Sequence, residues 1–353
     1  MAKRHTKQNS KQALGQYFTT NANTILEGYE SLVVGKKVMD PFAGGSDLLN
    51  WATKNGATHT QGYDLVPQSS NIIQNDSLCN PPDYTDYLLV TNPPYLSANK
   101  CRTGDRKPYQ IWGEGDYYKC HLASLAKMNC DEALEIVPSN FFCESRDGIR
   151  KRLFETHHIV SAKYWDQPVF DDATTGICVL HLRKGKKPEQ KFKLRILPAD
   201  VLIDVELTKE NKFLHGKEFF DYIRNVETIN IVKTDVGMTK PNTNIVVGLL
   251  DNGAQPVGLS YNQKDPIYCQ PKSFTTYQLT LPDYDISEDQ QKQIVEIFQN
   301  KMSYFRQKYH SMFLANYMGP AQKIFSRSYV HLMLSKIINE LKIAKRDSLF
   351  VFE

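Results

Sequence analysis

Asn92-Pro93-Pro94-Tyr95 is a tetrapeptide whose residue types suit chemistry on an amine attached to an aromatic ring. Such an amine is a poor nucleophile because its lone pair is delocalised into the ring. The side-chain oxygen of Asn92 can accept one of its N–H groups and the Pro93 carbonyl the other, which favours a localised lone pair. Tyr95 offers a flat face on which a base can stack. An ordinary proline-rich turn after a strand contains the same residues, so the surrounding sequence decides between the two interpretations.

Polar residues also follow the strands predicted before this tetrapeptide. A short apolar strand ends at Asp40, and the turn after it contains Gly44 and Gly45. The two glycines let the backbone approach a ligand closely, although a tight strand-to-helix turn explains them equally well. Asp64 ends the next predicted strand, where an acid can accept hydrogen bonds from ribose hydroxyls. Asp76 ends a third unit, where an acid can bind the amine of a cofactor adenine.

The elements that must position these residues alternate between short apolar strands and helical stretches from Lys37 to about Arg183. This alternation predicts a mainly parallel, doubly wound sheet with helices on both faces. The carboxyl ends of parallel strands meet at one edge of such a sheet. We therefore expect Asp40, Asp64 and Asn92 to lie close together.

Taken in order, these motifs resemble those of the amino-methyltransferases that use S-adenosylmethionine. The resemblance is to the DNA adenine-N(6) methyltransferases in which the cofactor motif comes first and the recognition region last. Further segments that match the family are 13–19, 116–118, 136–141 and 169–176. The chain departs from the family pattern at Thr20, where many relatives carry proline, and at the adjacent Gly44 and Gly45, which relatives often separate. The resemblance implies an α/β fold with a Rossmann-like class I methyltransferase sheet, mostly parallel and doubly wound.

The resemblance also implies the site residues and the reaction, which is methyl transfer to the N(6) amine of an adenine extruded from double-stranded DNA. The catalytic residues that it implies are Asn92, Pro93, Pro94 and Tyr95. Tyr95 and Phe170 are the residues expected to stack on the two faces of the base. The residues implied for binding S-adenosylmethionine, or its product S-adenosylhomocysteine, are Gln16, Tyr17, Phe18, Thr19, Asp40, Phe42, Ala43, Gly44, Asp64, Leu65, Asp76, Ser77 and Asn92.

The chain of 353 residues exceeds one typical domain, so we expect two. Residues 1–188 are predicted to form the S-adenosylmethionine-binding catalytic domain. Residues 189–353 are predicted to form a mixed α+β domain that recognises the DNA target. Within this second part, strands are expected in the runs 192–197, 244–250 and 273–281, and helices across 287–345.

The formal net charge of +4 permits nucleic-acid binding without demonstrating it. A basic stretch follows the last catalytic-domain motif, and two further basic residues stand among aromatic residues near the C-terminal end. Solvated lysines at a domain junction are the commoner explanation of such a stretch. The basic residues predicted to contact DNA are Arg183, Lys184, Lys186, Lys187, Arg306 and Lys308.

Several classes of protein are disfavoured by the composition. No apolar run approaches the length of a membrane span, and the first residues lack an apolar signal segment. The seven cysteines show no C-x-x-C spacing and no cluster with histidine, which favours reduced thiols and implies no metal. We expect a cytoplasmic protein without a membrane segment.

Three other functions remain open from the sequence. Glutamine methyltransferases that act on release factors carry a similar catalytic tetrapeptide, but their extra domain precedes the cofactor motif. Methylation of adenine in RNA is a second alternative, and a degenerate fold kept as a binding module is a third. The chain shows no nuclease-like motif, so we expect any cognate restriction endonuclease to be a separate protein.

Overall fold

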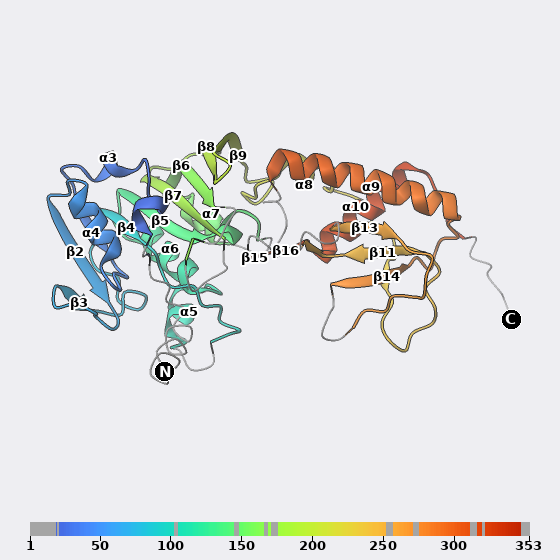
Figure 1. The fold of residues 1–353 in the computed structure, drawn as a ribbon, viewed down its shortest axis with the longest axis horizontal. Coiled ribbons are helices and arrows are strands. Elements are labelled where there is room, and N and C mark those ends of the chain that lie inside the picture. Colours follow the sequence, from blue (N-terminus) through green and yellow to red (C-terminus); the bar gives the residue numbers. More distant parts are fainter. Residues whose placement is uncertain are drawn as a thin grey trace. The chain divides into compact units, whose positions relative to one another are not determined.

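The structure is a computed structural model that describes residues 19, 21–101, 105–144, 148–165, 169–170, 176–251, 257–270, 275–310, 316–319 and 322–346. It contains two compact units (Figure 1). The first comprises residues 1–141 and 145–213, and the second comprises residues 142–144 and 214–353. Each unit has its own sheet and its own apolar core, so each is described by itself.

A sheet of nine strands forms the centre of the first unit, in the order β3-β2-β1-β4-β5-β7-β6-β8-β9. Strands β1 to β5 are parallel, and β7 is inserted antiparallel between β5 and β6. The first seven strands therefore form the Rossmann-like sheet of class I methyltransferases, as predicted. The strands are β1 (Lys37–Asp40), β2 (His59–Asp64), β3 (Ile72–Gln74), β4 (Tyr87–Thr91), β5 (Glu132–Pro138), β6 (His157–Trp165), β7 (Ile177–Lys184), β8 (Gln190–Leu197) and β9 (Val201–Leu207).

Helices cover both faces of this sheet, because successive side chains of a strand point to opposite faces. Val90 and Ile136 pack with Leu48 of α4 in one apolar cluster. Glu135, the neighbour of Ile136, points to the other face, where its carboxylate lies 3.0 Å from His121 of α6. The helices of this unit are α2 (Ala22–Ile25), α3 (Glu30–Val33), α4 (Asp47–Lys54), α5 (Lys107–Trp112), α6 (Tyr117–Lys127) and α7 (Ile149–Leu153).

The boundary between the units lies after residue 213, so the predicted boundary after residue 188 is wrong. β8 pairs in parallel with β6, and β9 pairs antiparallel with β8. Both strands therefore extend the sheet of the first unit. The strand predicted at 192–197 is confirmed, but its pairing partner lies in the preceding domain. A sequence pattern shows that a strand exists and does not show which sheet it joins.

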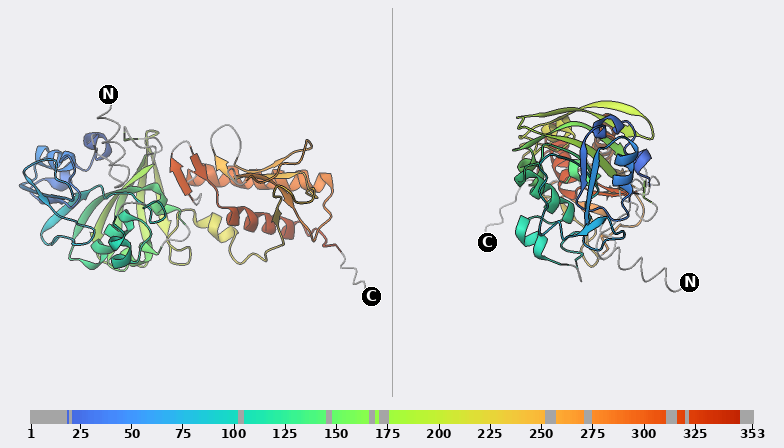
Figure 2. Two further views of the ribbon diagram at one scale, coloured as in Figure 1. Left: turned by 90° about the horizontal axis from the view of Figure 1, so that it is seen from below. Right: turned by 90° about the vertical axis from the view of Figure 1, so that its left-hand side faces the viewer.

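The second unit combines two antiparallel sheets, β10-β14-β11-β13 and β12-β16-β15, with two long helices that pack side by side (Figure 2). Its longest helix begins with a capping box, in which the Ser287 side chain accepts from the Gln290 N–H and the Gln290 side chain accepts from the Ser287 N–H. The elements are α8 (Lys217–Tyr222), β10 (Val232–Lys233), β11 (Ile245–Gly248), β12 (Leu250–Asp251), β13 (Gly258–Tyr261), β14 (Thr276–Thr280), α9 (Glu288–Tyr309), β15 (Asn316–Gly319), β16 (Gln322–Ile324) and α10 (Arg327–Glu340).

One local expectation needs correction. The stretch 287–345 is not helical throughout, because β15 and β16 form a hairpin between α9 and α10. The polar stretch 99–115, which follows Asn92-Pro93-Pro94-Tyr95, contains the helix α5. None of the seven cysteines, all of which the structure describes, forms a disulfide bond. Among the helices that the structure describes, none is both long and apolar enough to cross a membrane.

Candidate active site

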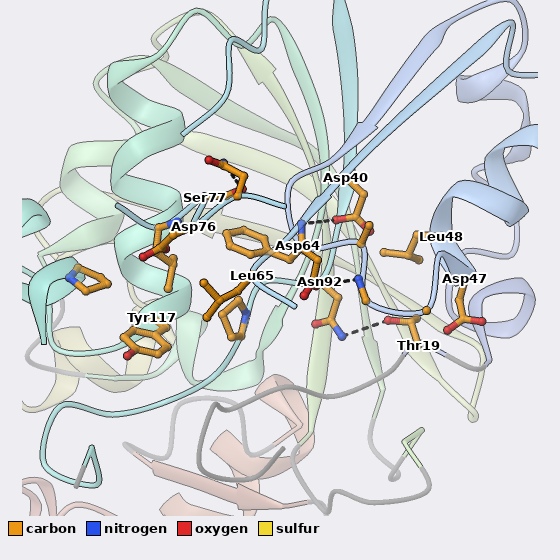
Figure 3. A pocket seen from close by; sticks show the side chains of 18 of the residues that line it. Thr19, Asp40, Asp47, Leu48, Asp64, Leu65, Asp76, Ser77, Asn92 and Tyr117 are labelled. Atoms are coloured by element: carbon orange, nitrogen blue, oxygen red, sulfur yellow. Dashed lines mark hydrogen bonds between the residues drawn. The ribbon is translucent and has the colours of Figure 1, made fainter. Parts of the chain in front are cut away.

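A pocket lies where β1, β2, β3 and β4 end, next to the point at which the strand order reverses (Figure 3). Open α/β sheets bind their ligands at this position. The space between its walls, open solvent at the mouth included, measures about 900 Å³. It is lined by Thr19, Asp40, Phe42, Ala43, Gly44, Gly45, Asp47, Leu48, Asp64, Leu65, Asn75, Asp76, Ser77, Leu78, Asn92, Pro94, Asp105, Pro108 and Tyr117.

Asp64 fixes the floor of the pocket. One of its carboxylate oxygens accepts from the Gly44 N–H at 2.9 Å, and the other accepts from the Val66 N–H at 2.8 Å. The Ala43 N–H donates to the Tyr63 carbonyl at 2.8 Å, so the glycine turn is bound to the end of β2 at two points. Gly44 has a φ of 47°, a backbone conformation that favours glycine. The turn is thereby held open over the ends of the strands.

Gly62 explains how closely β2 packs on its neighbours. A Cβ atom at this position would come within 2.7 Å of Leu49 in α4 and would also clash with Ile72 in β3. Any larger residue here would require the ends of the Leu49 and Ile72 side chains to shift. This packing places Asp64, two residues later, beside the glycine turn.

Asp40 lies beneath the same turn and is only 1% exposed. One carboxylate oxygen accepts from the Phe42 N–H at 3.0 Å and from the Thr91 hydroxyl at 2.6 Å. Burial raises the pKa of the Asp40 carboxyl to about 7, because the charged form loses its hydration, while these hydrogen bonds act in the opposite direction. Asp40 therefore joins the ends of β1 and β4 and is only partly ionised at neutral pH.

Asn92 occupies the first position after β4 and is 8% exposed. Its amide nitrogen donates to the Thr19 hydroxyl at 3.1 Å, and its oxygen accepts from the Tyr95 hydroxyl. The Tyr95 hydroxyl also lies 2.9 Å from the Ile136 carbonyl. One hydroxyl proton thus serves two acceptors, Asn92 and Ile136.

The far side of the pocket is formed by the turn after β3 and by helix α5. The Asp76 carboxylate accepts from the Leu78 and Cys79 N–H groups at 3.2 Å each. Pro108 of α5 lines the pocket beside Tyr117, whose hydroxyl donates to the Asp105 carbonyl at 2.6 Å. The segment that follows the catalytic tetrapeptide therefore folds back as a wall of the same pocket.

The charges around the pocket all have one sign. Five aspartates line it, and none of its described lining residues is lysine, arginine or histidine. Apolar groups such as Leu65, Leu78 and Pro108 form the remaining walls. This combination suits a ligand with a flat or apolar part and at least one positive charge, because an anionic ligand would meet only like charges.

Most of the predicted cofactor residues come together in this pocket. The predicted site residues that do not line it are of two kinds. Gln16, Tyr17 and Phe18 lie outside the described residues. Pro93 and Tyr95 do not line the pocket, although both adjoin residues that do. Gly45 belongs to the predicted glycine turn, and the lining residues that the sequence did not indicate are Asp47, Leu48, Asn75, Leu78, Asp105, Pro108 and Tyr117. Gly45 and Tyr117 stand in segments that resemble family motifs, and the others carry no signal beyond proximity to one.

Phe170 is 5% exposed and belongs to the same apolar cluster as Ile136, against which Tyr95 also packs. The expected pair of stacking residues is therefore near one apolar region of the first unit. The role of Phe170 in binding a base stays a prediction. Residues 171–175, which follow it, lie outside the part of the chain that the structure describes.

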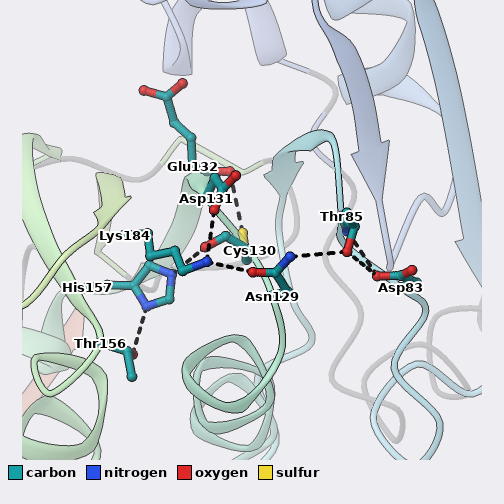
Figure 4. A network of polar contacts seen from close by, with 9 residues as sticks. All are labelled: Asp83, Thr85, Asn129, Cys130, Asp131, Glu132, Thr156, His157 and Lys184. Carbon is teal, nitrogen blue, oxygen red and sulfur yellow. Dashed lines mark hydrogen bonds and ion pairs between the residues drawn. The ribbon is translucent and has the colours of Figure 1, made fainter.

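The first group of predicted DNA contacts lies at the other end of the strands. Arg183 pairs with Glu132, the first residue of β5, because β7 runs antiparallel to β5. The two side chains form an ion pair at 2.8 Å. Lys184 donates to Asn129 at 2.5 Å and to Asp131 at 3.1 Å, within a wider polar network (Figure 4).

Lys186 is paired with Glu155, and Lys187 is exposed on the same connection. The four basic residues lie at the opposite end of the strands from Asn92. They therefore cannot contact DNA next to a base that is held at Asn92. In the second unit, Lys308 is paired with Glu218, whose carboxylate also accepts from Tyr304 at 2.7 Å. Arg306 lies on the same helix, α9, and its predicted contact with DNA stays a prediction.

One group of side chains has the geometry of a metal site. Asp76, Cys79 and Asp105 each offer a ligand atom within 4.8 Å of the others. Burial raises the pKa of the Cys79 thiol to about 12, so the neutral thiol prevails rather than the thiolate that binds metals. Asp76 is already used by two backbone N–H groups, and the group borders the pocket that suits a cationic organic ligand.

Comparisons with known proteins give only distant likenesses. No protein-family model matches the chain, and neither does any curated protein. A modification subunit of a putative type I restriction enzyme from Vibrio vulnificus is 14% identical, with 59% of this chain and 51% of that chain covered and a TM-score of 0.41. A putative class I S-adenosylmethionine-dependent methyltransferase from Listeria monocytogenes is 15% identical, with 51% and 65% covered and a TM-score of 0.40.

The M protein of the type I restriction enzyme EcoKI is 12% identical, with 95% of this chain and 72% of that chain covered and a TM-score of 0.40. The chain spans about half to two thirds of the length of the first two structures. Likenesses of this degree do not assign a function, which has to be argued from the site itself.

Proposed function

We propose that this protein is a DNA methyltransferase that transfers a methyl group from S-adenosylmethionine to the N(6) amine of an adenine. The observation that carries the proposal is the position of Asn92. It lies at the end of β4, hydrogen-bonded to Thr19, in the wall of a pocket formed by the ends of β1, β2 and β3. An acceptor for an aromatic amine thus borders a pocket suited to a cationic nucleoside.

The residues of the pocket fit S-adenosylmethionine in charge and shape. The sulfonium and the ammonium group are positive, and the lining contains five aspartates. Asp76 and the apolar Leu65, Leu78 and Pro108 suit the adenine, and Asp64 keeps lone pairs for ribose hydroxyls beyond the two backbone N–H groups that it binds. The glycine turn leaves room for the amino-acid part.

The proposed chemistry needs orientation more than proton transfer. When bound, S-adenosylmethionine supplies a methyl group already activated on a sulfonium, so no strong general base is required. Asn92 and the Pro93 carbonyl accept the two N–H groups of the target amine and localise its lone pair. Tyr95 holds the Asn92 side chain through its hydroxyl and presents its ring to the base. A paired adenine cannot reach this position, so the base has to leave the duplex.

The second unit is the proposed target-recognition domain, and a restriction-modification system or a virus is the proposed context. A cognate endonuclease would then be a separate chain. Methylation of adenine in RNA, or of glutamine in a protein, uses the same arrangement of acceptors around a planar amine. The substrate class is therefore the part of the proposal that an experiment must decide.

The test is transfer of label from methyl-labelled S-adenosylmethionine to three substrates: unmethylated genomic DNA, RNA, and a release factor. The products are digested and the labelled nucleoside or amino acid is identified. We expect label in N(6)-methyldeoxyadenosine, and we expect Asn92→Ala to reduce it by about 100-fold or more, as for loss of one key transition-state hydrogen bond. Label only in RNA or protein would replace DNA as the substrate, and label in none would overturn the proposal.

A further inference from the structure

Asp47 is an acidic residue of the pocket that none of the roles above uses. It is the first residue of α4, is half-buried, and lines the cavity. Its carboxylate makes no hydrogen bond or ion pair with any residue that the structure describes. Its charge is therefore free to pair with a cation bound in the cavity, through a charge-assisted hydrogen bond.

The other acids of the pocket already serve the protein. Asp40 is buried and accepts from Phe42 and Thr91. Asp64 uses both oxygens on backbone N–H groups, and Asp76 accepts from two more. Asp105 accepts from the Lys107 N–H at 2.9 Å and lies 3.9 Å from the Lys107 amine. Asp47 is therefore the one lining carboxylate, among those described, with no such partner.

The position of Asp47 in the pocket indicates which group of a ligand it would meet. Figure 3 shows Asp47 beside Thr19, on the side of the pocket away from Asp76 and Tyr117. If the adenine lies at Asp76, the amino-acid part of the cofactor lies on the Asp47 side. No side chain caps the N-terminus of α4, so its first N–H groups suit the carboxylate of that amino acid. Asp47 supplies the negative charge that the ammonium group needs.

We propose that Asp47 binds the α-ammonium group of the cofactor through a charge-assisted hydrogen bond. This inference rests on the proposed function and names one residue of the binding site for it. It predicts that Asp47 recognises a single group of the ligand, whereas the other acids shape the pocket as a whole.

Calorimetric titration of the full chain tests the proposal with two ligands: S-adenosylhomocysteine, and its analogue that lacks the α-amino group. The variants are Asp47→Asn and, as a control in the same pocket, Asp105→Asn. We expect Asp47→Asn to weaken S-adenosylhomocysteine binding by about 10- to 100-fold, the range for a hydrogen bond to a charged group, and to leave the analogue unaffected. Asp105→Asn is expected to change both affinities by the same factor.

Equal effects of Asp47→Asn on the two ligands, or no effect on either, would overturn the role of Asp47 and leave the proposed function standing. If the wild-type chain binds neither ligand, the proposed function fails, and the role of Asp47 fails with it. Thermal unfolding checks that Asp47→Asn is folded. Asp47→Ser, which keeps a residue suited to a helix start, provides the same comparison if it is not.

Discussion

The two ends of the parallel strands in the first unit use charge in opposite ways. At the carboxyl ends, aspartates from distant parts of the sequence converge on one pocket and bind backbone N–H groups such as those of Gly44 and Val66. At the amino ends, Arg183 and Lys184 stand together in the sequence, but strand pairing places Glu132 and an adjacent acid beside them. The scattered charges form a site, and the contiguous ones are neutralised by their neighbours.

A run of like charges in a sequence is therefore weak evidence that these residues form a binding surface. Pairing between strands decides which charges meet, and β7 brings its basic end to the acidic start of β5. The polar ends of parallel strands are better grounds, because parallel pairing always brings them to the same edge. Four variants test whether the two ends of the strands differ in this way.

The largest effect is expected from Asp64→Ala at the carboxyl ends. It removes the acceptor of the Gly44 and Val66 N–H groups, so the turn that forms the pocket floor loses its anchor. We expect the affinity for S-adenosylhomocysteine to fall by about 2 to 3 kcal/mol, measured by calorimetry. Asp83→Ala is the matched control, since Asp83 also accepts a backbone N–H, that of Thr85 at 3.0 Å, but precedes β4. Similar losses in both variants would contradict the account.

The pKa of Asp40 gives a second, pH-dependent prediction. This pKa is raised from 3.8 to about 7, so between these values the folded protein keeps a proton that the unfolded chain has lost. The resulting stabilisation is complete below about pH 4 and is lost progressively as the pH rises to about 7. We expect the free energy of unfolding of the wild type, relative to Asp40→Asn, to fall by roughly 1 to 3 kcal/mol between pH 5 and pH 8 in urea titrations. A difference that is constant with pH would show that Asp40 titrates normally.

A smaller effect is expected from Tyr95→Phe, which removes the hydroxyl bonded to Asn92 and Ile136 but keeps the ring. The Asn92 side chain is then less well oriented, so we expect the methyl-transfer rate to fall by a factor equivalent to about 1 kcal/mol. Binding of S-adenosylhomocysteine should not change. Tyr87→Phe, at the amino end of β4, the strand that precedes Tyr95, is the control. A rate loss of the same size in the control would remove the special role of the Tyr95 hydroxyl.

The smallest effect is expected at the amino ends. Exposed ion pairs contribute roughly 0 to 1 kcal/mol, so the double variant Arg183→Ala with Lys184→Ala should unfold almost as the wild type does. We also expect DNA affinity to keep its dependence on salt concentration, measured by fluorescence anisotropy. Loss of about one unit of slope per residue would show that these side chains do contact phosphates and would restore the prediction made from the sequence.

The sheet of the first unit could be predicted because its signals are local. Apolar strands that end in Asp40, Asp64 and Asn92 alternate with helical stretches, and parallel pairing then fixes their order and the edge at which they meet. The residue at which the first unit ends could not be predicted from local signals. β8 and β9 look like any other strands, and their pairing onto β6 depends on contacts between distant parts of the chain.

In the candidate site, too, residues with a local sequence signal could be predicted, and residues placed by long-range folding could not. Residues within motifs, such as Asp64 and Ser77, were found because each follows a strand end. Asp105 and Pro108 were missed because they enter the pocket when α5 folds back, and no periodicity marks that fold. Asp47 was missed for another reason, since an acid in the first turn of a helix is common and needs no ligand to explain it.

The central claim is that the carboxyl ends of the strands carry out methyl transfer to adenine in DNA. It is tested most directly by nucleoside mass spectrometry of DNA from cells that lack adenine methylation and express either the wild type or Asn92→Ala. The account predicts N(6)-methyldeoxyadenosine with the wild type and none with Asn92→Ala at equal protein levels. Modified DNA with both proteins, or unmodified DNA with a wild type that binds S-adenosylmethionine, would contradict it.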